Sequence, residues 1–300
     1  MKKRTLVLIL LGLIISLTAF FVVRSIDTDV LEQVSIPQSK EKSTIDQEAD
    51  IKEHHPEEKE NQEERMTEQF KDFITDAVQS TIDFFRNKDI RFLAIGDSLT
   101  QGIGDETDQG GYVGILDRTI HASEQRMEVT FDNFGKRGNR TDQLLARLDE
   151  QDIQQSMIEA DIILITIGAN DIMEVFKQNF TNLTIEPFQE ERHHFEQRLH
   201  QIFTKIRDTN KHAHIYLLGI YNPFAQYFQE IEELEIIVNE WNRTSSMITN
   251  QFNHATFIPI KDLFENTNVN LFADDNFHPN RQGYELMAER VLDYLTATEE

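Results

Sequence analysis

The feature that most constrains this chain is an alternation of short apolar runs with longer helical patterns between residues 90 and 295. The apolar runs cover 90–95, 127–134, 161–167, 214–220 and 256–260. Apolar residues at helical spacing cover 112–122, 141–148, 187–208, 230–251 and 280–295. Strands that are apolar almost throughout and alternate with amphipathic helices are typical of a parallel sheet covered on both faces. The predicted fold class is therefore α/β, and we expect a single domain after residue 66.

The N-terminus differs from the rest of the chain in charge and hydropathy. Residues 1–4 form a basic head, and residues 5–23 are nineteen consecutive positions without a charge. As a helix rising about 1.5 Å per residue, this stretch would be about 28 Å long, close to the roughly 30 Å hydrocarbon layer of a membrane. Residues 5–23 therefore predict a transmembrane signal-anchor. Because basic residues precede the span, the head is expected in the cytoplasm and the rest of the chain outside the cell membrane.

Two other interpretations of residues 5–23 stay open. A cleaved signal peptide would release a secreted protein, although residues 17–21 contain no small-x-small cleavage site. A buried core helix would normally carry a polar stripe, which this segment lacks. We expect the anchor, which predicts a single-pass membrane protein whose folded domain is extracytoplasmic.

Residues 24–65 have the composition of a tether. They contain 13 acidic and 6 basic residues and no periodic apolar face, so they cannot bury enough apolar surface to order themselves. We predict an acidic disordered linker, although a partner-binding acidic tail would have the same composition. From Met66, apolar residues recur at three- and four-residue steps, which predicts a helix that packs on a core. The folded domain is expected to span 66–300.

The overall charge and the absence of cysteine exclude several functions. The chain has 29 Lys and Arg against 53 Asp and Glu, a formal net charge of −24 at pH 7. Nucleic-acid binding depends on cations that displace counterions from phosphates, so nucleic acid is not an expected partner. Without cysteine, disulfides, thiolate catalysis and Cys-ligated zinc are excluded. The sequence shows no cluster of metal ligands, and we expect neither a metal nor an organic cofactor.

Residues suited to chemistry follow the predicted strands. In open α/β sheets, ligands bind beyond the carboxyl ends of the strands. Four segments hold such positions: 96–100 (Gly-Asp-Ser-Leu-Thr), 133–139 (Asn-Phe-Gly-Lys-Arg-Gly-Asn), 168–171 (Gly-Ala-Asn-Asp) and 275–279 (Asp-Asn-Phe-His-Pro). Together they supply a hydroxyl nucleophile, backbone and amide donors, and an acid/base pair. These are the groups that acyl transfer requires.

Ser98 is the candidate nucleophile. A serine hydroxyl needs a general base at neutral pH, and His278 suits this role because an unperturbed imidazole titrates near pH 6.5. The imidazole needs a group that fixes its tautomer, and Asp275 can reach it from three residues earlier. Asp274 is adjacent, but the Asp-x-x-His spacing favours Asp275.

Candidate oxyanion donors are the backbone N–H groups of Ser98 and Gly138 and the side-chain amide of Asn170. Glycine suits position 138 because a Cβ would intrude where backbone approaches the substrate. Each residue also has a structural interpretation. Ser98 could only cap a helix, Gly138 could be a turn glycine, and Asn170 with Asp171 could be a turn pair.

The four segments resemble blocks I, II, III and V of the SGNH/GDSL hydrolases, in the same order, and the resemblance covers roughly residues 90–295. It implies Ser98 as nucleophile and first oxyanion donor, Gly138 and Asn170 as further donors, His278 as base and Asp275 as the third triad member. It also implies a flavodoxin-like three-layer sandwich of about five parallel strands with helices on both faces. The run 96–105 is similar to a Gram-positive bacterial subgroup described as lysophospholipase-like or esterase-like.

The expected function is hydrolysis of acyl esters, of a lipid or an acylated glycan, through an acyl-Ser98 intermediate. An α/β-hydrolase elbow is excluded because Thr100 occupies the position of its last glycine. An O-acetylesterase or O-acyltransferase acting on cell-wall glycans stays open, as does a tethered binding protein that has lost catalysis. The acyl length, the leaving group and the oligomeric state are not indicated by the sequence.

Two sets of residues near the predicted site have more than one interpretation. Aromatic residues in the predicted loops 174–186 and 221–229 could line an acyl groove or pack in the core; they are Phe176, Phe180, Tyr221, Phe224, Tyr227 and Phe228. Lys136, Arg137 and Arg140 flank Gly138 and are expected to be surface charges, which on so acidic a chain could also steer an anionic head group to the site.

Overall fold

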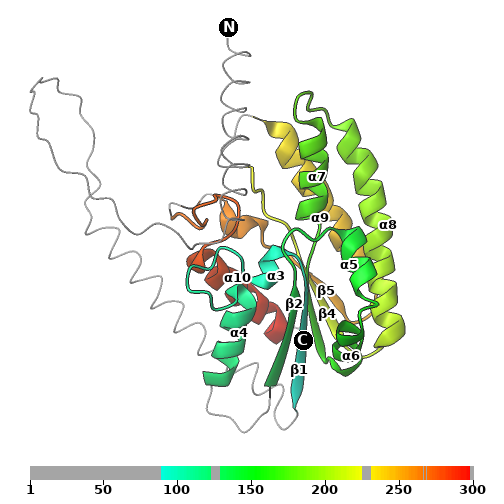
Figure 1. Cartoon of the computed structure of the whole chain (residues 1–300), viewed down its shortest axis with the longest axis vertical. Helices are drawn as coiled ribbons and strands as arrows, with labels where there is room; N and C mark the ends of the chain where they lie inside the picture. Colours follow the sequence, from blue (N-terminus) through cyan, green and yellow to red (C-terminus); the bar gives the residue numbers. More distant parts are fainter. Residues whose placement is uncertain (1–88, 123–128, 225–230, 266, 268, 298–300) are drawn as a thin grey trace, which may run out of the picture. The chain divides into compact units, whose positions relative to one another are not determined.

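The computed structural model of the chain describes residues 89–122, 129–224, 231–265, 267 and 269–297 (Figure 1). The predicted anchor at 5–23, the linker at 24–65 and the helix expected from Met66 lie outside these residues. Within the described ranges, no helix combines the length and the apolar character needed to cross a membrane.

Five parallel strands form one sheet in the order β2-β1-β3-β4-β5. The strands are β1 (Ile90–Gly96), β2 (Val129–Gly135), β3 (Ile162–Thr166), β4 (His214–Leu218) and β5 (Ala255–Ile258). This is the strand order of flavodoxin-like folds. In it, β2 lies on one side of β1, and β3, β4 and β5 follow one another on the other side. The predicted fold class and the five predicted strands are confirmed.

Helices cover both faces of the sheet (Figure 1). One face is covered by α4 (Gly111–Ala122) and α10 (Arg281–Ala297), and η1 (Lys261–Phe264) packs on α10. The other face is covered by α5 (Thr141–Arg147), α6 (Gln151–Glu159), α7 (Ala169–Asn179), α8 (Glu186–Thr209) and α9 (Glu232–Thr249). A four-residue helix, α3 (Ser98–Gln101), follows β1 directly. The result is the predicted three-layer sandwich.

Alternation along the strands divides the apolar residues between two cores. In β1, Phe92 and Ala94 belong to the core under α4 and α10, whereas Leu93 and Ile95 belong to the core under α8 and α9. This follows from the two-residue period of strand side chains. Strand β3 is buried along its whole length because it lies at the centre of the sheet. The two cores hold the carboxyl ends of the strands in fixed register.

Three helices were not predicted from the sequence. The α6 helix buries only Ile153 and Met157, and two apolar anchors in nine residues give too little periodicity to detect. The α7 helix extends to Asn179, so the expected loop at 174–186 is in fact helical over its first part. It was missed because polar residues dominate its first turn. The third, α3, is only four residues long, too short to show a helical period.

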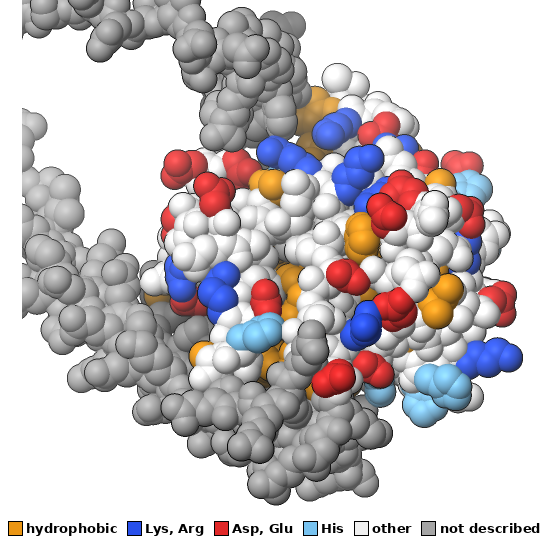
Figure 2. All heavy atoms as spheres, turned by 60° about the horizontal axis from the view of Figure 1, so that its bottom comes forward, with side chains coloured by type: hydrophobic (Ala, Val, Ile, Leu, Met, Phe, Trp, Pro, Cys, Tyr) orange, Lys and Arg blue, Asp and Glu red, His pale blue; other side chains and the backbone are white. Residues whose placement is uncertain are grey.

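Charged side chains of both signs intermingle on the face shown in Figure 2, and hydrophobic side chains occupy small separate patches there. Among the described residues, the large apolar side chains that are exposed are Ile158 on α6 and Ile236 and Met247 on α9. Single exposed apolar residues of this kind are ordinary.

Candidate active site

A tight strand-to-helix turn places Ser98. Gly96 ends β1 with a φ of +144°, and a Cβ there would lie 2.0 Å from the carbonyl oxygen of Thr166 on β3. Only glycine therefore allows this approach of β1 to β3. Asp97 then caps α3, since its carboxylate accepts from the Leu99 N–H at 3.0 Å. Ser98 is the first helical residue and not the cap, so the capping interpretation of Ser98 is wrong.

The structure brings Ser98, His278 and Asp275 into one hydrogen-bonded chain. The Nε2 atom of His278 lies 2.9 Å from the Ser98 Oγ, and its Nδ1 lies 2.6 Å from Asp275 Oδ2. Asp275 Oδ1 also accepts from the backbone N–H of His278 at 2.9 Å, which fixes the carboxylate against the loop. Since an ionised carboxylate only accepts, Nδ1 carries the proton and Nε2 can accept from the Ser98 hydroxyl.

Two carboxyl groups near Ser98 have pKa values that are shifted in opposite directions. Burial acts to raise the pKa of Asp275, but the hydrogen bonds from the ring and backbone of His278 outweigh it and lower the pKa to about 2. Asp275 is therefore ionised at neutral pH and can stabilise an imidazolium. Burial raises the pKa of Asp97 to about 6, against hydrogen bonds from Thr166 and Leu99 that lower it.

Ser98 and His278 are each only 4% exposed. Both side chains are therefore buried, although they follow a strand end and a loop. The cause is the segment that follows α3. At Gly104, a Cβ would lie 2.8 Å from the Cβ of His278 and 2.5 Å from the carbonyl oxygen of Pro279, so this loop packs directly against the histidine.

The segment that carries Gly138 lies beside α3. The Arg137 N–H donates to Gln101 Oε1 at 2.6 Å, and the Asn133 side chain donates to the Thr100 carbonyl at 2.7 Å. Gly138 has a φ of +79°, and no atom lies within 4 Å of the position that a Cβ would take. The left-handed backbone favours glycine here, and no protein atom crowds the position. Close approach of this backbone to the substrate, the reason expected from the sequence, stays a prediction.

Asn170 is the second residue of α7, which follows β3. Its Nδ2 donates to the carbonyl oxygen of Asn139 at 3.0 Å, which joins the start of α7 to the residue after Gly138. Asn170 and Ser98 line the same pocket. The turn-pair interpretation of Asn170 and Asp171 is wrong, because both residues belong to the first turn of the helix.

The pocket beside Ser98 has one polar corner and an otherwise mostly apolar wall. The space that a water molecule can reach within it is about 20 Å³. Its lining residues are Asp97, Ser98, Leu99, Thr166, Ile167, Ala169, Asn170, Gly219, Ile220, Tyr221, Pro223 and Phe277. Tyr221 donates to the Phe277 carbonyl at 2.6 Å, which ties two parts of the wall together.

Of the aromatic residues proposed for an acyl groove, Tyr221 lines this pocket. Phe176 instead packs on Phe180 and Phe224, at ring-centroid distances of 5.7 and 4.9 Å. Tyr227 and Phe228 lie outside the described residues.

The basic residues near Gly138 differ in their surroundings. Lys136 and Arg137 are exposed, whereas Arg140 is half-buried and lies 3.2 Å from Asp142 and 3.9 Å from Glu174. Steering of an anionic head group by these residues stays a prediction. In the part of the chain that the structure describes, no three His, Asp or Glu side chains are grouped to hold a metal ion.

Sequence reasoning missed a group of polar residues around the site. Thr166 donates to Asp97 at 2.8 Å, and Asp171 accepts from Thr141 and Arg198. Asp171 could have been suspected because it adjoins Asn170. Thr141, Thr166 and Arg198 left no signal in one sequence, because only the fold brings them to the site.

Comparison with known proteins agrees with this geometry. Residues 94–286 match the GDSL-like Lipase/Acylhydrolase family. An uncharacterized Bacillus subtilis protein, YpmR, is 39% identical over 200 residues, which cover 66% of this chain and 78% of that protein. The spore germination lipase LipC of Bacillus licheniformis is 28% identical over 209 residues, covering 67% of this chain and 94% of the lipase.

Solved structures show the same fold. The lipase Lip_vut3 from a goat rumen metagenome has a TM-score of 0.60 and 27% identity, covering 67% of this chain and 95% of that one. A variant of Axe2, an acetyl-xylooligosaccharide esterase from Geobacillus stearothermophilus, has a TM-score of 0.55 and 22% identity, covering 70% and 95%. At 22% identity, the likeness to Axe2 concerns the fold alone. From the family match and the curated relatives, the chain belongs to the GDSL-like lipase/acylhydrolase family and is a carboxylic ester hydrolase.

Proposed function

We propose that this hydrolase acts through a covalent acyl-Ser98 intermediate. The Ser98 Oγ attacks the ester carbonyl carbon while His278 Nε2 takes the hydroxyl proton, and Asp275 stabilises the resulting imidazolium. Collapse of the tetrahedral intermediate breaks the bond to the alcohol, which leaves with that proton. Water then attacks the acyl carbon by the same route and releases the acid and free Ser98. The observation that carries this proposal is the unbroken chain from Ser98 through His278 to Asp275.

The oxyanion would be held by three donors. The Ser98 N–H lies in the first turn of α3, where backbone N–H groups have no partner within the helix. Gly138 supplies a second backbone N–H from the segment beside α3. Asn170 supplies its amide, which uses one hydrogen on Asn139 and has a second for the substrate. Such donors act on charge that develops only in the transition state.

The proposed substrate is a lipid ester of the lysophospholipid type. The likeness to a spore germination lipase and to a rumen lipase supports this class, as does the apolar wall formed by Ile167, Ile220 and Tyr221. We also propose that residues 5–23 anchor the enzyme in the cell membrane, with the catalytic domain outside and the linker 24–65 as its tether. A lipid-ester substrate at the outer surface of the membrane would then be within reach of Ser98.

A second candidate is an O-acetylesterase acting on cell-wall glycans. The observation in its favour is the small volume of the pocket beside Ser98, which is about 20 Å³ between the described residues. A site of that size fits a short acyl group better than a long chain.

The test is a substrate series run with the full-length protein. Turnover would be measured on p-nitrophenyl esters from acetyl to dodecanoyl, on a lysophospholipid and on an acetylated glycan. We expect Ser98→Ala to abolish turnover and Ser156→Ala, a serine on α6, to leave it unchanged. Retention of a tenth of the rate by Ser98→Ala would refute the mechanism. A preference for the acetyl ester and the glycan over the lysophospholipid would replace the lipid proposal with the second candidate.

A further inference from the structure

The proposed oxyanion donors come from two strands that are not neighbours. Gly138 follows β2 and Asn170 follows β3, and β1 lies between these strands in the sheet. Strand pairing therefore does not fix one donor directly against the other. A contact beyond the sheet has to set their relative position.

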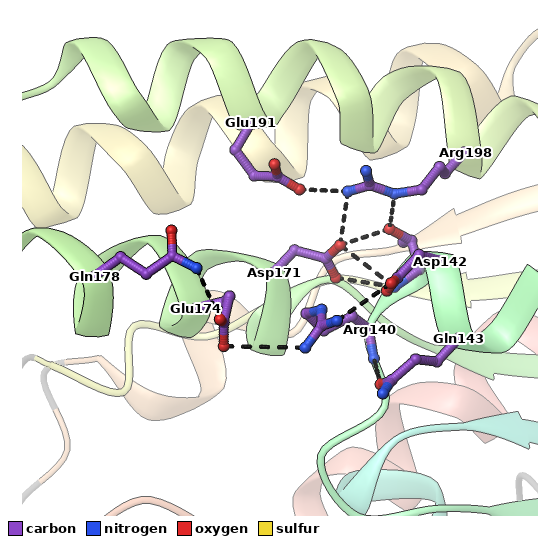
Figure 3. Close-up of polar contacts among 9 residues, drawn as sticks. Arg140, Asp142, Gln143, Asp171, Glu174, Gln178, Glu191 and Arg198 are labelled. Atoms are coloured by element: carbon purple, nitrogen blue, oxygen red, sulfur yellow. Dashed lines mark hydrogen bonds and ion pairs between the residues drawn. The ribbon is translucent and has the colours of Figure 1, made fainter.

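Such a contact is made by the carboxylate of Asp171 (Figure 3), whose side chain is fully buried. Its Oδ2 accepts from the Thr141 N–H at 3.1 Å, and its Oδ1 accepts from the Thr141 hydroxyl at 2.5 Å. Thr141 is the first residue of α5 and lies three residues after Gly138, while Asp171 directly follows Asn170. The carboxylate thus connects the two donor segments.

Arg198 on α8 holds this connection in place. Its Nη2 donates to Asp171 Oδ1 at 3.0 Å, and its Nε donates to the Thr141 hydroxyl at 2.7 Å. Arg198 also pairs with Glu191, which lies about two turns earlier on the same face of α8 (Figure 3). Because a guanidinium presents its donors in a rigid plane, it fixes the carboxylate and the hydroxyl together. The cluster of Thr141, Asp171 and Arg198 is called the clamp below.

We infer that the clamp sets the distance between the Gly138 and Asn170 oxyanion donors, and that Thr141, Asp171 and Arg198 are positioning residues for ester hydrolysis. This inference rests on the proposed function. None of the three lines the pocket beside Ser98, so they act through the donors and not on the substrate. The Asn170 side chain also donates to the Asn139 carbonyl. Because Asn139 lies two residues before Thr141, a shift of Thr141 would move this acceptor and with it the Asn170 amide.

The sharpest test uses two variants of one residue. Thr141→Val keeps the volume and removes the hydroxyl, whereas Thr141→Ser keeps the hydroxyl. With full-length protein and p-nitrophenyl acetate, we expect Thr141→Val to lower kcat about 10- to 100-fold with KM within about twofold, because displaced donors weaken only transition-state binding. Thr141→Ser is expected within about threefold of the parent. Asp171→Asn is expected to follow Thr141→Val.

The pathway of the effect is tested in a double variant. If the clamp acts through the donors, Thr141→Val should cost much less in a chain that already carries Asn170→Ala. Asp262→Asn breaks a carboxylate–arginine pair with Arg290, between η1 and α10, and should leave kcat unchanged. Circular dichroism and the melting temperature of each variant separate loss of fold from loss of rate.

Two results would overturn the inference. One is a fall in melting temperature for Thr141→Val with unchanged kcat, which would make the clamp purely structural. The other is full additivity with Asn170→Ala. Failure of the proposed function looks different, since Ser98→Ala would then keep its turnover in the same assay.

Discussion

The amino and carboxyl ends of the sheet use buried polar groups in different ways. At the amino end, Asn210 lies between α8 and β4, and within the described part of the chain its side chain bonds only to backbone groups. Its Nδ2 donates to the carbonyl oxygens of Met157 at 2.9 Å and Ala160 at 2.8 Å. Its Oδ1 accepts from the N–H groups of His212 and Ala213, each at 2.9 Å. One side chain thus closes the connections around the start of β4.

At the carboxyl end, buried side chains bond to one another as well as to backbone. His278 links Ser98 to Asp275. Within the clamp, Arg198 links the Thr141 hydroxyl to the Asp171 carboxylate. Within the described ranges, the buried carboxyl and imidazole groups all lie at this end; they are Asp97, Asp105, Asp171 and His278. Bonds from a side chain to backbone stabilise a loop, whereas bonds between side chains can pass a proton or fix a donor. The carboxyl end has both kinds of bond, since Asn170 also donates to the Asn139 carbonyl, and it is the end where buried side chains are linked in a way that chemistry can use.

The largest effect expected from this contrast is at Asp275. Asp275→Asn replaces an ionised acceptor with an amide that can favour the wrong tautomer of His278, so kcat should fall about 10³- to 10⁴-fold. Asp274→Asn changes the exposed neighbour and is the matched control, expected within about twofold of the parent. Steady-state kinetics on a p-nitrophenyl ester would check both. Equal losses in the two variants would contradict the assignment of Asp275.

The next effect is at Asn170. Asn170→Ala removes one donor to a charge that forms only in the transition state, so kcat should fall about 10²- to 10³-fold with little change in KM. Asn179→Ala, at the other end of α7, removes an amide that donates to the Val175 carbonyl and should leave kcat unchanged. A change confined to KM would assign Asn170 to substrate binding instead.

At the amino end, the same kind of change should affect stability alone. Asn210→Ala leaves two N–H groups, of which that of Ala213 is buried, and two buried carbonyls without this partner, which should lower the free energy of unfolding by about 2 to 4 kcal/mol. The kcat of the folded enzyme should stay within about twofold. Urea unfolding and kinetics on one preparation would measure both, and a tenfold loss of kcat would break the contrast between the two ends.

The pH dependence of stability should also come from the carboxyl end. Since burial raises the pKa of Asp97 from 3.8 to about 6, the folded state holds a proton in this interval that the unfolded state has released. The Asp97 contribution to stability is therefore present below pH 4 and is lost as the pH rises to 6, by at most about 3 kcal/mol. Asp97→Asn keeps an acceptor for Leu99 and removes the titration. Urea unfolding from pH 4 to 7 should show a flatter profile for the variant, and identical profiles would contradict the shift.

Much of the fold could be predicted because the apolar runs of β1, β3 and β4 are long and almost unbroken. The chemistry of the site could be located because Ser98, Asn170 and His278 follow predicted strands or the last loop, where ligands bind in such sheets. These are local properties of the sequence.

The clamp could not be predicted for the opposite reason. Thr141 and Arg198 are 57 residues apart, and they meet only because α5 packs on α8. The burial of Ser98 and His278 was likewise missed, since it depends on where the loop at Gly104 folds back. Nothing in the local pattern specifies such a meeting of distant segments.

The most direct test of the mechanism is covalent labelling of the full-length protein with a fluorophosphonate, followed by intact mass and peptide mapping. Only an activated serine reacts readily with this reagent. We expect a single adduct on the peptide that contains Ser98, much slower labelling of His278→Ala, and no adduct on Ser98→Ala. Rapid labelling of a different residue, or ester turnover by a protein whose Ser98 stays unlabelled, would contradict the acyl-Ser98 mechanism.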